Sequence, residues 1–137
     1  MGYVRGRDME RFVGIILAAG EGIRMKSRIP KVLHCLGGKE LIRYPVELLG
    51  KVGVERIIVV ISPTNQEAVK SLLGDSVEYA VQTSKTGTAG AVESAVSLVG
   101  DQAKQVVVLD LYSSGCLWLV WHLAGYSWVV SPIVWAL

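Results

Sequence analysis

The sequence predicts an α/β fold in which a mostly parallel sheet carries helices on both faces. Four short segments rich in Val and Ile have the composition of buried strands: residues 11–19, 56–61, 77–81 and 105–109. Segments with helical spacing of apolar residues alternate with these strands along the chain. This alternation favours parallel pairing, and ligands bind such sheets at the carboxyl ends of the strands.

The first strand, residues 11–19, is a nearly continuous apolar run that ends at Gly20. The residues that follow, 21–34, are basic and contain Pro30, so we expect a long loop there. The carboxyl end of the first strand therefore combines small residues with positive charge, which makes it a candidate ligand site.

Three helices are predicted between the strands, at residues 43–52, 65–73 and 88–99. Pro45 fits the first of them because the first helical turn tolerates a residue without an N–H group. A glycine follows each helix and favours its termination; these glycines are Gly53, Gly74 and Gly100.

Composition limits the possible class of protein. The chain of 137 residues is long enough for one domain with a hydrophobic core. Its formal net charge of +2 gives no electrostatic reason to expect a nucleic-acid partner. Two cysteines are too few for a disulfide framework.

The charged residues are unevenly distributed along the chain. All 14 basic and 12 acidic residues lie at or before Asp110, and all four tryptophans lie after it. We therefore divide the chain into an N-terminal extension (1–8), a body (9–110) and an uncharged, Trp-rich tail (111–137).

A glycine-containing loop follows the first strand: residues 17–25 read LAAGEGIRM, and Pro30-Lys31 come shortly after. It lacks the Gly-Lys-Ser/Thr of a Walker A loop and the third glycine of the dinucleotide fingerprint. Its small residues allow the backbone to approach a planar base or a phosphate closely. Arg24 and Lys31 supply two cations that would neutralise charge developing at a phosphoryl centre.

This block resembles the signature of sugar-nucleotide pyrophosphorylases. The continuation PKVLHCLGGK at residues 30–39 narrows the resemblance to the bifunctional bacterial N-acetylglucosamine-1-phosphate uridylyltransferase/glucosamine-1-phosphate acetyltransferases. Val81-Gln82 and the segment GTAGAV at residues 87–92 agree with it. The resemblance covers residues 9–110 and implies a Rossmann-like nucleotide-diphospho-sugar transferase fold, present here incompletely.

The resemblance also implies roles for the matching residues. Arg24 and Lys31 would be catalytic, binding the phosphates and assisting the displacement of pyrophosphate. The Gln82 amide would read uracil, because it can both donate and accept along one base edge. The implied nucleotide-binding residues are Leu17, Ala18, Ala19, Gly20, Gln82, Gly87 and Thr88.

The reaction implied by the resemblance is attack of N-acetylglucosamine 1-phosphate on the α-phosphate of UTP, with Mg²⁺ bridging the phosphates. The products are UDP-N-acetylglucosamine and pyrophosphate. The same resemblance implies a cytoplasmic protein with small-molecule partners and neither a nucleic-acid nor a membrane partner. It leaves the oligomeric state open, because the trimer of the family depends on its C-terminal domain.

Several of these residues also have a simpler interpretation. The basic residues of the first loop could form a solvated surface, and Gln82 could be an ordinary polar residue at a strand end. Thr88 could serve as a helix N-cap, with or without a ligand role. We expect a structural role for His34 and a buried position for Cys35.

The sequence departs from the family pattern at a few positions. Ile23 stands where Thr or Ser is usual, and Gly90 stands where His is usual. Leu111 and Tyr112 occupy the positions of a Gly-Asp pair whose aspartate is a magnesium ligand in the family. Asp110 comes too early on a strand whose side chains alternate faces, so we do not expect it to substitute. The sequence thus predicts no metal ligand and impaired turnover.

The tail, residues 111–137, admits three interpretations. The first, which we favour, is a shifted reading frame after Asp110. A membrane-spanning segment is the second, weakened by polar residues and by the lack of flanking Lys or Arg. The third is a segment that packs over the sheet in place of the missing half. Two other functions stay open: a pyrophosphorylase for another sugar or nucleotide, and a non-catalytic nucleotide-binding fragment.

Overall fold

The fold is known from a computed structural model. It describes residues 12–20, 26–84, 86–100, 103 and 105–111, together with the backbone of residues 117–122 and 128–131.

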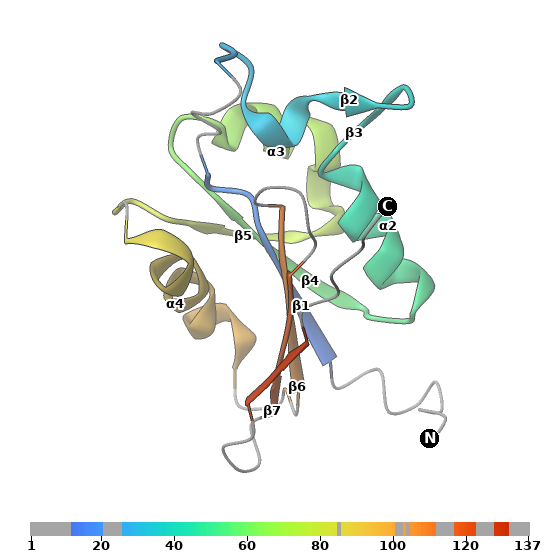
Figure 1. The fold of residues 1–137 in the computed structure, drawn as a ribbon, viewed down its shortest axis with the longest axis vertical. Helices are drawn as coiled ribbons and strands as arrows, with labels where there is room; N and C mark the ends of the chain where they lie inside the picture. Colours follow the sequence, from blue (N-terminus) through green and yellow to red (C-terminus); the bar gives the residue numbers. More distant parts are fainter. Residues whose placement is uncertain are drawn as a thin grey trace.

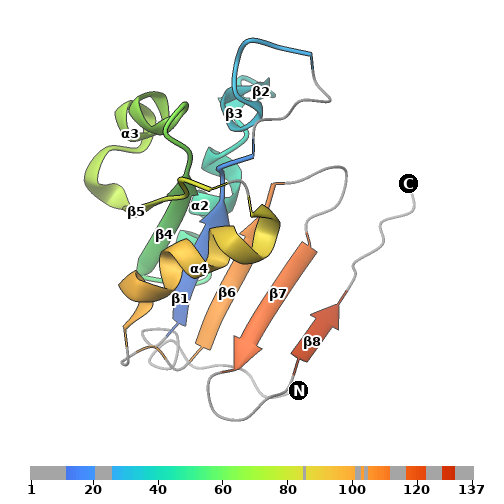
Figure 2. The ribbon, with the colours of Figure 1, turned by 90° about the vertical axis from the view of Figure 1, so that its left-hand side faces the viewer.

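A six-stranded sheet in the order β5-β4-β1-β6-β7-β8 forms the centre of the molecule (Figure 2). The strands β5, β4, β1 and β6 run parallel to one another, whereas β7 and β8 are antiparallel to their neighbours. The parallel part contains all four strands that the sequence predicts. These strands are β1 (Phe12–Leu17), β4 (Arg56–Ile61), β5 (Glu78–Val81) and β6 (Gln105–Asp110).

Helices cover both faces of the parallel part, which confirms the predicted class. In Figure 1 the sheet is seen nearly edge-on, with α4 (Gly87–Val99) on one side and α2 (Arg43–Lys51) on the other. The core cluster under α4 contains residues of β1, β4 and β6. The second cluster joins the opposite face of these strands to α2 and to α3 (Gln66–Leu73).

The central strand β1 shows why its sequence is apolar throughout. Val13, Ile15 and Leu17 belong to the cluster under α4, whereas Ile16 belongs to the cluster under α2 and α3. Successive side chains of a strand point to opposite faces, so a strand covered on both sides needs apolar residues at every position. β1 lies between β4 and β6, and its carboxyl end therefore opens in the middle of the sheet.

A short hairpin that the sequence analysis does not predict lies between β1 and α2. It consists of β2 (Cys35–Leu36) and β3 (Lys39–Glu40), joined by Gly37 and Gly38 with φ values of 60° and 79°. Two central residues with positive φ are typical of a tight hairpin turn. Cys35 is exposed on this hairpin, so the expectation of a buried cysteine is wrong. Both residues of β2 are exposed, because the hairpin forms a separate two-stranded sheet outside the central one.

The described part of the long loop contains a single 3₁₀ turn, η2 (Lys31–Leu33). Val32 is only 2% exposed and anchors this turn in the core. The Nε2 atom of His34 lies 3.1 Å from the carbonyl oxygen of Ile29. Because a carbonyl oxygen can only accept a hydrogen bond, Nε2 is the donor. This contact closes the loop on itself and supports the structural role expected for His34.

The tail contributes two strands, β7 (Leu117–His122) and β8 (Trp128–Ser131). β7 pairs with β6 along its whole length, from Gln105 opposite His122 to Asp110 opposite Leu117. The described residues of the tail thus extend the sheet at its edge. Among the helices that the structure describes, none is long and apolar enough to cross a membrane.

Candidate functional site

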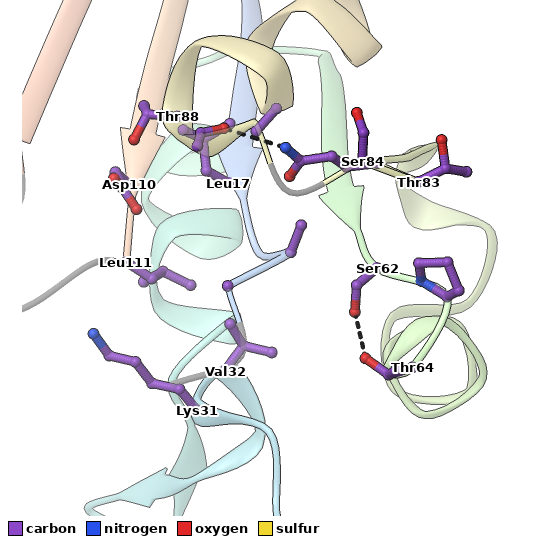
Figure 3. A pocket seen from close by; sticks show the side chains of 16 residues that line it. Leu17, Lys31, Val32, Ser62, Thr64, Thr83, Ser84, Thr88, Asp110 and Leu111 are labelled. Atoms are coloured by element: carbon purple, nitrogen blue, oxygen red, sulfur yellow. Dashed lines mark hydrogen bonds between the residues drawn. The ribbon is translucent and has the colours of Figure 1, made fainter. Parts of the chain in front are cut away.

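A pocket of about 650 Å³ lies at the carboxyl ends of the parallel strands (Figure 3). This is the place where α/β sheets of this type bind ligands. β1, β4, β5 and β6 each contribute residues to it at or just after their last position. The lining residues are Leu17, Ala19, Gly20, Lys31, Val32, Ser62, Pro63, Thr64, Gln82, Thr83, Ser84, Gly87, Thr88, Ala91, Asp110 and Leu111.

Most of the residues that the sequence singles out come together in this pocket. Of the nucleotide-binding set, six line it, and Lys31 of the catalytic pair lines it too: Leu17, Ala19, Gly20, Gln82, Gly87, Thr88 and Lys31. Ala18 is the exception within the described residues, since it is 1% exposed and belongs to the core. Arg24 and Tyr112 lie outside the described residues.

The backbone of Ala18 is fully engaged inside the protein. Its N–H donates to the Val60 carbonyl oxygen at 2.8 Å, and its own carbonyl accepts from Asn65 Nδ2 at 2.8 Å. Ala18 therefore offers no polar backbone group to a base. Within the segment that the resemblance assigns to uracil, this leaves the exposed end, Ala19 and Gly20, as the part that can present backbone groups to a ligand.

Asn65 lies in the loop after β4, and no motif in the sequence points to it. Its side chain is 2% exposed, and its Oδ1 accepts a hydrogen bond from the Ser62 N–H at 3.0 Å. The same amide donates to Ala18, so it links the loop after β4 to the loop after β1. Asn65 is the N-cap residue of α3, yet its side chain makes no cap hydrogen bond, because both ends of its amide are used in the link.

Gln82 is the first residue after β5. Its N–H donates to the Ile61 carbonyl oxygen at 2.8 Å, which continues the pairing with β4 by one residue. Its side-chain Nε2 donates to the Gly87 carbonyl oxygen at 3.2 Å. The amide is thereby directed to the start of α4 while its residue lines the pocket, where it can meet a ligand.

The start of α4 forms one wall of the pocket. Gly87, its first residue, has φ +74°, a conformation that favours glycine. Thr88 is the second helical residue, and the N-cap position belongs to Thr86. The interpretation of Thr88 as an N-cap is therefore wrong, and its hydroxyl lies in the pocket lining instead. Backbone N–H groups at a helix start are suited to bind an anion.

Charged residues lie on one side of the pocket. Figure 3 shows Lys31, Asp110 and Leu111 on the side opposite Ser62 and Thr64. Asp110 ends β6 and pairs in register with Leu17, which places it beside the carboxyl end of β1. Asp110 is part of the pocket lining, and whether it substitutes for the metal ligand of the family stays a prediction.

Magnesium can be tested against these residues. Mg²⁺ is commonly held by one or two carboxylates together with water and substrate phosphates. Among the described lining residues Asp110 is the one carboxylate, and the described part of the chain contains no group of three candidate ligands. The donor set therefore fits a cation that arrives with a nucleotide, and it does not form a cage that would hold the metal by itself.

Sequence reasoning missed the polar wall made by Ser62, Pro63 and Thr64 and by Thr83 and Ser84. The Ser62 and Thr64 hydroxyls are hydrogen-bonded to each other at 2.8 Å. A signal was available, because both segments directly follow predicted parallel strands, where ligand-binding residues gather. Neither segment carries a charge or a motif, so nothing in the pattern separated them from ordinary turns.

Curated relatives match the N-terminal part of the chain. The Bifunctional protein GlmU of Exiguobacterium sibiricum is 42% identical over 95 residues, which are 69% of this chain and 21% of that protein. The protein of the same name from Exiguobacterium sp. is 46% identical over 101 residues, 73% of this chain and 22% of that protein. The chain thus spans about one-fifth of the length of these relatives.

Solved structures agree on the fold. A putative glucose-1-phosphate thymidylyltransferase from Bacillus anthracis superimposes with a TM-score of 0.66 at 28% identity, over 72% of this chain and 43% of that one. The inositol-1-phosphate CTP transferase from T. maritima gives a TM-score of 0.60 at 30% identity, over 72% and 42%. The Nucleotidyl transferase family profile matches residues 13–111, which contain β1 except for Phe12, the elements from there to β6, and the described pocket lining. The chain therefore belongs to the nucleotidyl transferase family.

Proposed function

We propose that the pocket binds a uridine nucleotide, and that the protein transfers a uridylyl group from UTP to N-acetylglucosamine 1-phosphate. The observation that carries the proposal is the convergence of Gln82, Gly87–Thr88 and Lys31 on one pocket beside the Ala19–Gly20 backbone. The relatives named GlmU also support the proposal, because they are bifunctional proteins and the sequence motifs resemble a bifunctional family as well.

Base recognition falls to the Gln82 amide and to the backbone of Ala19 and Gly20. An amide presents an acceptor and a donor side by side, which matches the adjacent donor and acceptor on the edge of uracil. Leu17 supplies an apolar surface at the same place, and it is held in the core on its other side. The aliphatic surface and the polar edge together suit a planar base.

Phosphate recognition falls to Lys31 and to the start of α4. Lys31 places a positive charge on the η2 turn, and the N–H groups at Gly87 and Thr88 begin a helix of 13 residues. Mg²⁺ would add neutralisation of the phosphates, with Asp110 as its protein ligand. The second cation implied by the resemblance, Arg24, completes the catalytic pair in the proposal.

Turnover by this chain is expected to be impaired. Tyr112 takes the place of the magnesium-binding aspartate in the family pattern, and the tail residues do not match the family. The chain also spans about one-fifth of the relatives, so the complete reaction is a proposal about the protein to which this part belongs. Under this proposal, residues 9–110 supply nucleotide binding.

A direct test is calorimetric titration of the chain with UTP, CTP and TTP in the presence of Mg²⁺. We expect UTP to bind most tightly and Gln82→Ala to weaken it about three- to tenfold, the worth of one net hydrogen bond. Gln66→Ala is the matched control, because Gln66 begins α3 and is absent from the pocket lining. Equal affinity for all three nucleotides would contradict uridine recognition.

A second candidate function is a transferase for another nucleotide or sugar. The structural relatives carry this alternative, since their names specify thymidylyl and CTP transfer. Tighter binding of TTP or CTP in the same titration would favour it. Assay of pyrophosphate release from UTP and N-acetylglucosamine 1-phosphate then addresses turnover, which we expect to be far below that of a full-length relative.

A further inference from the structure

Gly90 lies immediately behind the pocket wall, at the fourth position of α4. It is buried and is not itself part of the pocket lining. A Cβ atom at this position would lie 1.6 Å from Thr86 Oγ1 and 2.6 Å from Thr86 Cβ. The same atom would lie 3.4 Å from Gln82 Nε2. Thr86 therefore occupies the space that any other residue at position 90 would need.

The two short distances have different consequences. The hydroxyl of Thr86 could rotate away, but its Cβ is bonded to the backbone and cannot move without it. A side chain at position 90 would therefore displace the backbone at Thr86 or the first turn of α4. Thr86 is the N-cap residue of α4, and its own N–H donates to the Ser84 carbonyl at 2.9 Å. The displacement would thus act on the loop that follows Gln82.

The loop matters because it carries the acceptor that orients Gln82. Gly87, next to Thr86, accepts the hydrogen bond from Gln82 Nε2. A carbonyl oxygen only accepts, so the nitrogen end of the amide must face Gly87 and the oxygen end must face elsewhere. The position of the Gly87 carbonyl therefore decides which end of the amide a ligand in the pocket can meet.

We propose that Gly90 acts as a positioning residue: because it has no side chain, Thr86 and the start of α4 stay in place, and the Gly87 carbonyl fixes the Gln82 amide for recognition of a nucleobase. The proposal deepens the proposed uridine binding and rests on it for the identity of the base. With its nitrogen end held by Gly87, the amide keeps its oxygen as an acceptor for the N3–H of uracil. Cytosine lacks this donor, so a fixed amide discriminates between the two pyrimidines.

The test uses the 137-residue chain and three variants. Gly90→Ala introduces the contact with Thr86. The double variant Thr86→Gly/Gly90→Ala removes both atoms that would clash with the new Cβ. Gly50→Ala is the matched control, because Gly50 is also helical and a Cβ there meets nothing within 4 Å. Alanine favours a helix over glycine, so helix propensity alone would not make Gly90→Ala harmful.

The first measurement needs no ligand. In ¹H–¹⁵N spectra of the free proteins, we expect Gly90→Ala to shift the signals of the Gln82 side-chain amide and of the Gly87 N–H. It should also speed solvent exchange of the Gln82 side-chain proton that is hydrogen-bonded to the Gly87 carbonyl. Gly50→Ala should leave these signals in place, and the double variant should restore them. Unchanged Gln82 and Gly87 signals in a folded Gly90→Ala protein would overturn the positioning role.

The second measurement is the ratio of the dissociation constants for CTP and UTP. We expect Gly90→Ala to lower this ratio about three- to tenfold, corresponding to one hydrogen bond, and the double variant to recover it. An equal loss of affinity for both nucleotides would contradict a role in base recognition. Failure of the unaltered chain to bind UTP would overturn the proposed function, whereas the spectra would still decide whether Gly90 positions Gln82.

Discussion

At the scale of single residues, Asn65 shows how a buried polar side chain shapes the pocket without touching a ligand. Its amide accepts from the Ser62 N–H and donates to the Ala18 carbonyl, so it holds together the loops after β4 and β1. Polar atoms at these three residues are buried together, and each has a partner through this amide. A buried amide of this kind stabilises through the cost of leaving its partners unpaired.

We predict that Asn65→Ala lowers the free energy of unfolding by about 1–3 kcal/mol, because it leaves the Ala18 carbonyl and the Ser62 N–H without their partner. It should also weaken UTP binding, since Ala18 adjoins Ala19 and Gly20, the segment proposed to contact the base. Urea titration followed by circular dichroism measures the first effect, and calorimetry measures the second.

Ser71→Ala is the control for this prediction, because Ser71 is an exposed residue of α3, the helix that follows Asn65. Asn65→Asp separates the two hydrogen bonds, since a carboxylate accepts from Ser62 but cannot donate to Ala18. Asn65→Ala with the stability of the unaltered chain would show that water replaces both partners.

At the scale of elements, Arg56 joins two strands and a helix at the end of the sheet opposite the pocket. Its Nε and Nη2 atoms donate to the Glu78 carboxylate at 2.8 and 3.0 Å, which ties β4 to β5. The guanidinium also donates to the carbonyls of Leu98 and Val99 at the end of α4. Arginine suits this place because its planar group donates in several directions at once.

The Arg56–Glu78 pair makes stability depend on pH. Hydrogen bonding and attraction from Arg56 lower the pKa of Glu78 below its ordinary value of 4.5, against a smaller opposite effect of burial. A carboxyl whose pKa is lowered by folding stabilises the protein above its unfolded pKa. This stabilisation is lost as the pH falls through the folded value.

We predict that Glu78→Gln lowers the free energy of unfolding at pH 7 by about 0.2–1 kcal/mol. The effect is small because the side chains of Arg56 and Glu78 are 44% and 43% exposed, so solvent screens their attraction. Urea titrations at pH 7 and below pH 4 should show the difference shrinking in acid. A difference that stays constant or grows in acid would contradict the assigned cause.

At the scale of the whole molecule, the two faces of the sheet are covered by separate core clusters. One cluster joins β1, β4, β5 and β6 to α4, and the other joins β1, β4 and β6 to α2 and α3. The buried residues that the structure describes in both clusters belong to the body of the chain. The tail strands β7 and β8 continue the sheet by backbone pairing at the outer edge of β6.

We predict that a chain ending after Leu111 still unfolds in one cooperative transition and binds UTP like the full chain. The reason is that the described residues of both core clusters and of the pocket lining fall within residues 12–111. Urea titration and calorimetry check the two parts. A shortened chain without a cooperative transition would show that β7 and β8 are required for the fold, and would contradict a division of the chain at Asp110.

The fold was largely predictable because local patterns determine it. The four parallel strands and three helices lie within a few residues of their expected positions, since apolar runs and terminating glycines mark them directly. The β2–β3 hairpin escaped prediction because its strands have two residues each, too few for a periodic pattern. The strands of the tail escaped for another reason, as its even apolar composition carries no alternation.

The sequence by itself determined the family, the parallel pairing of the strands and seven of the sixteen described residues that line the pocket. These follow from motifs and periodicities that act over short stretches of chain. Only the tertiary structure showed that Ala18 is turned inward by Asn65, that Gly90 makes room for Thr86, and that Asp110 reaches the pocket. Each of these depends on contacts between separate segments or turns, and such contacts are set by packing and strand register, which no local pattern encodes.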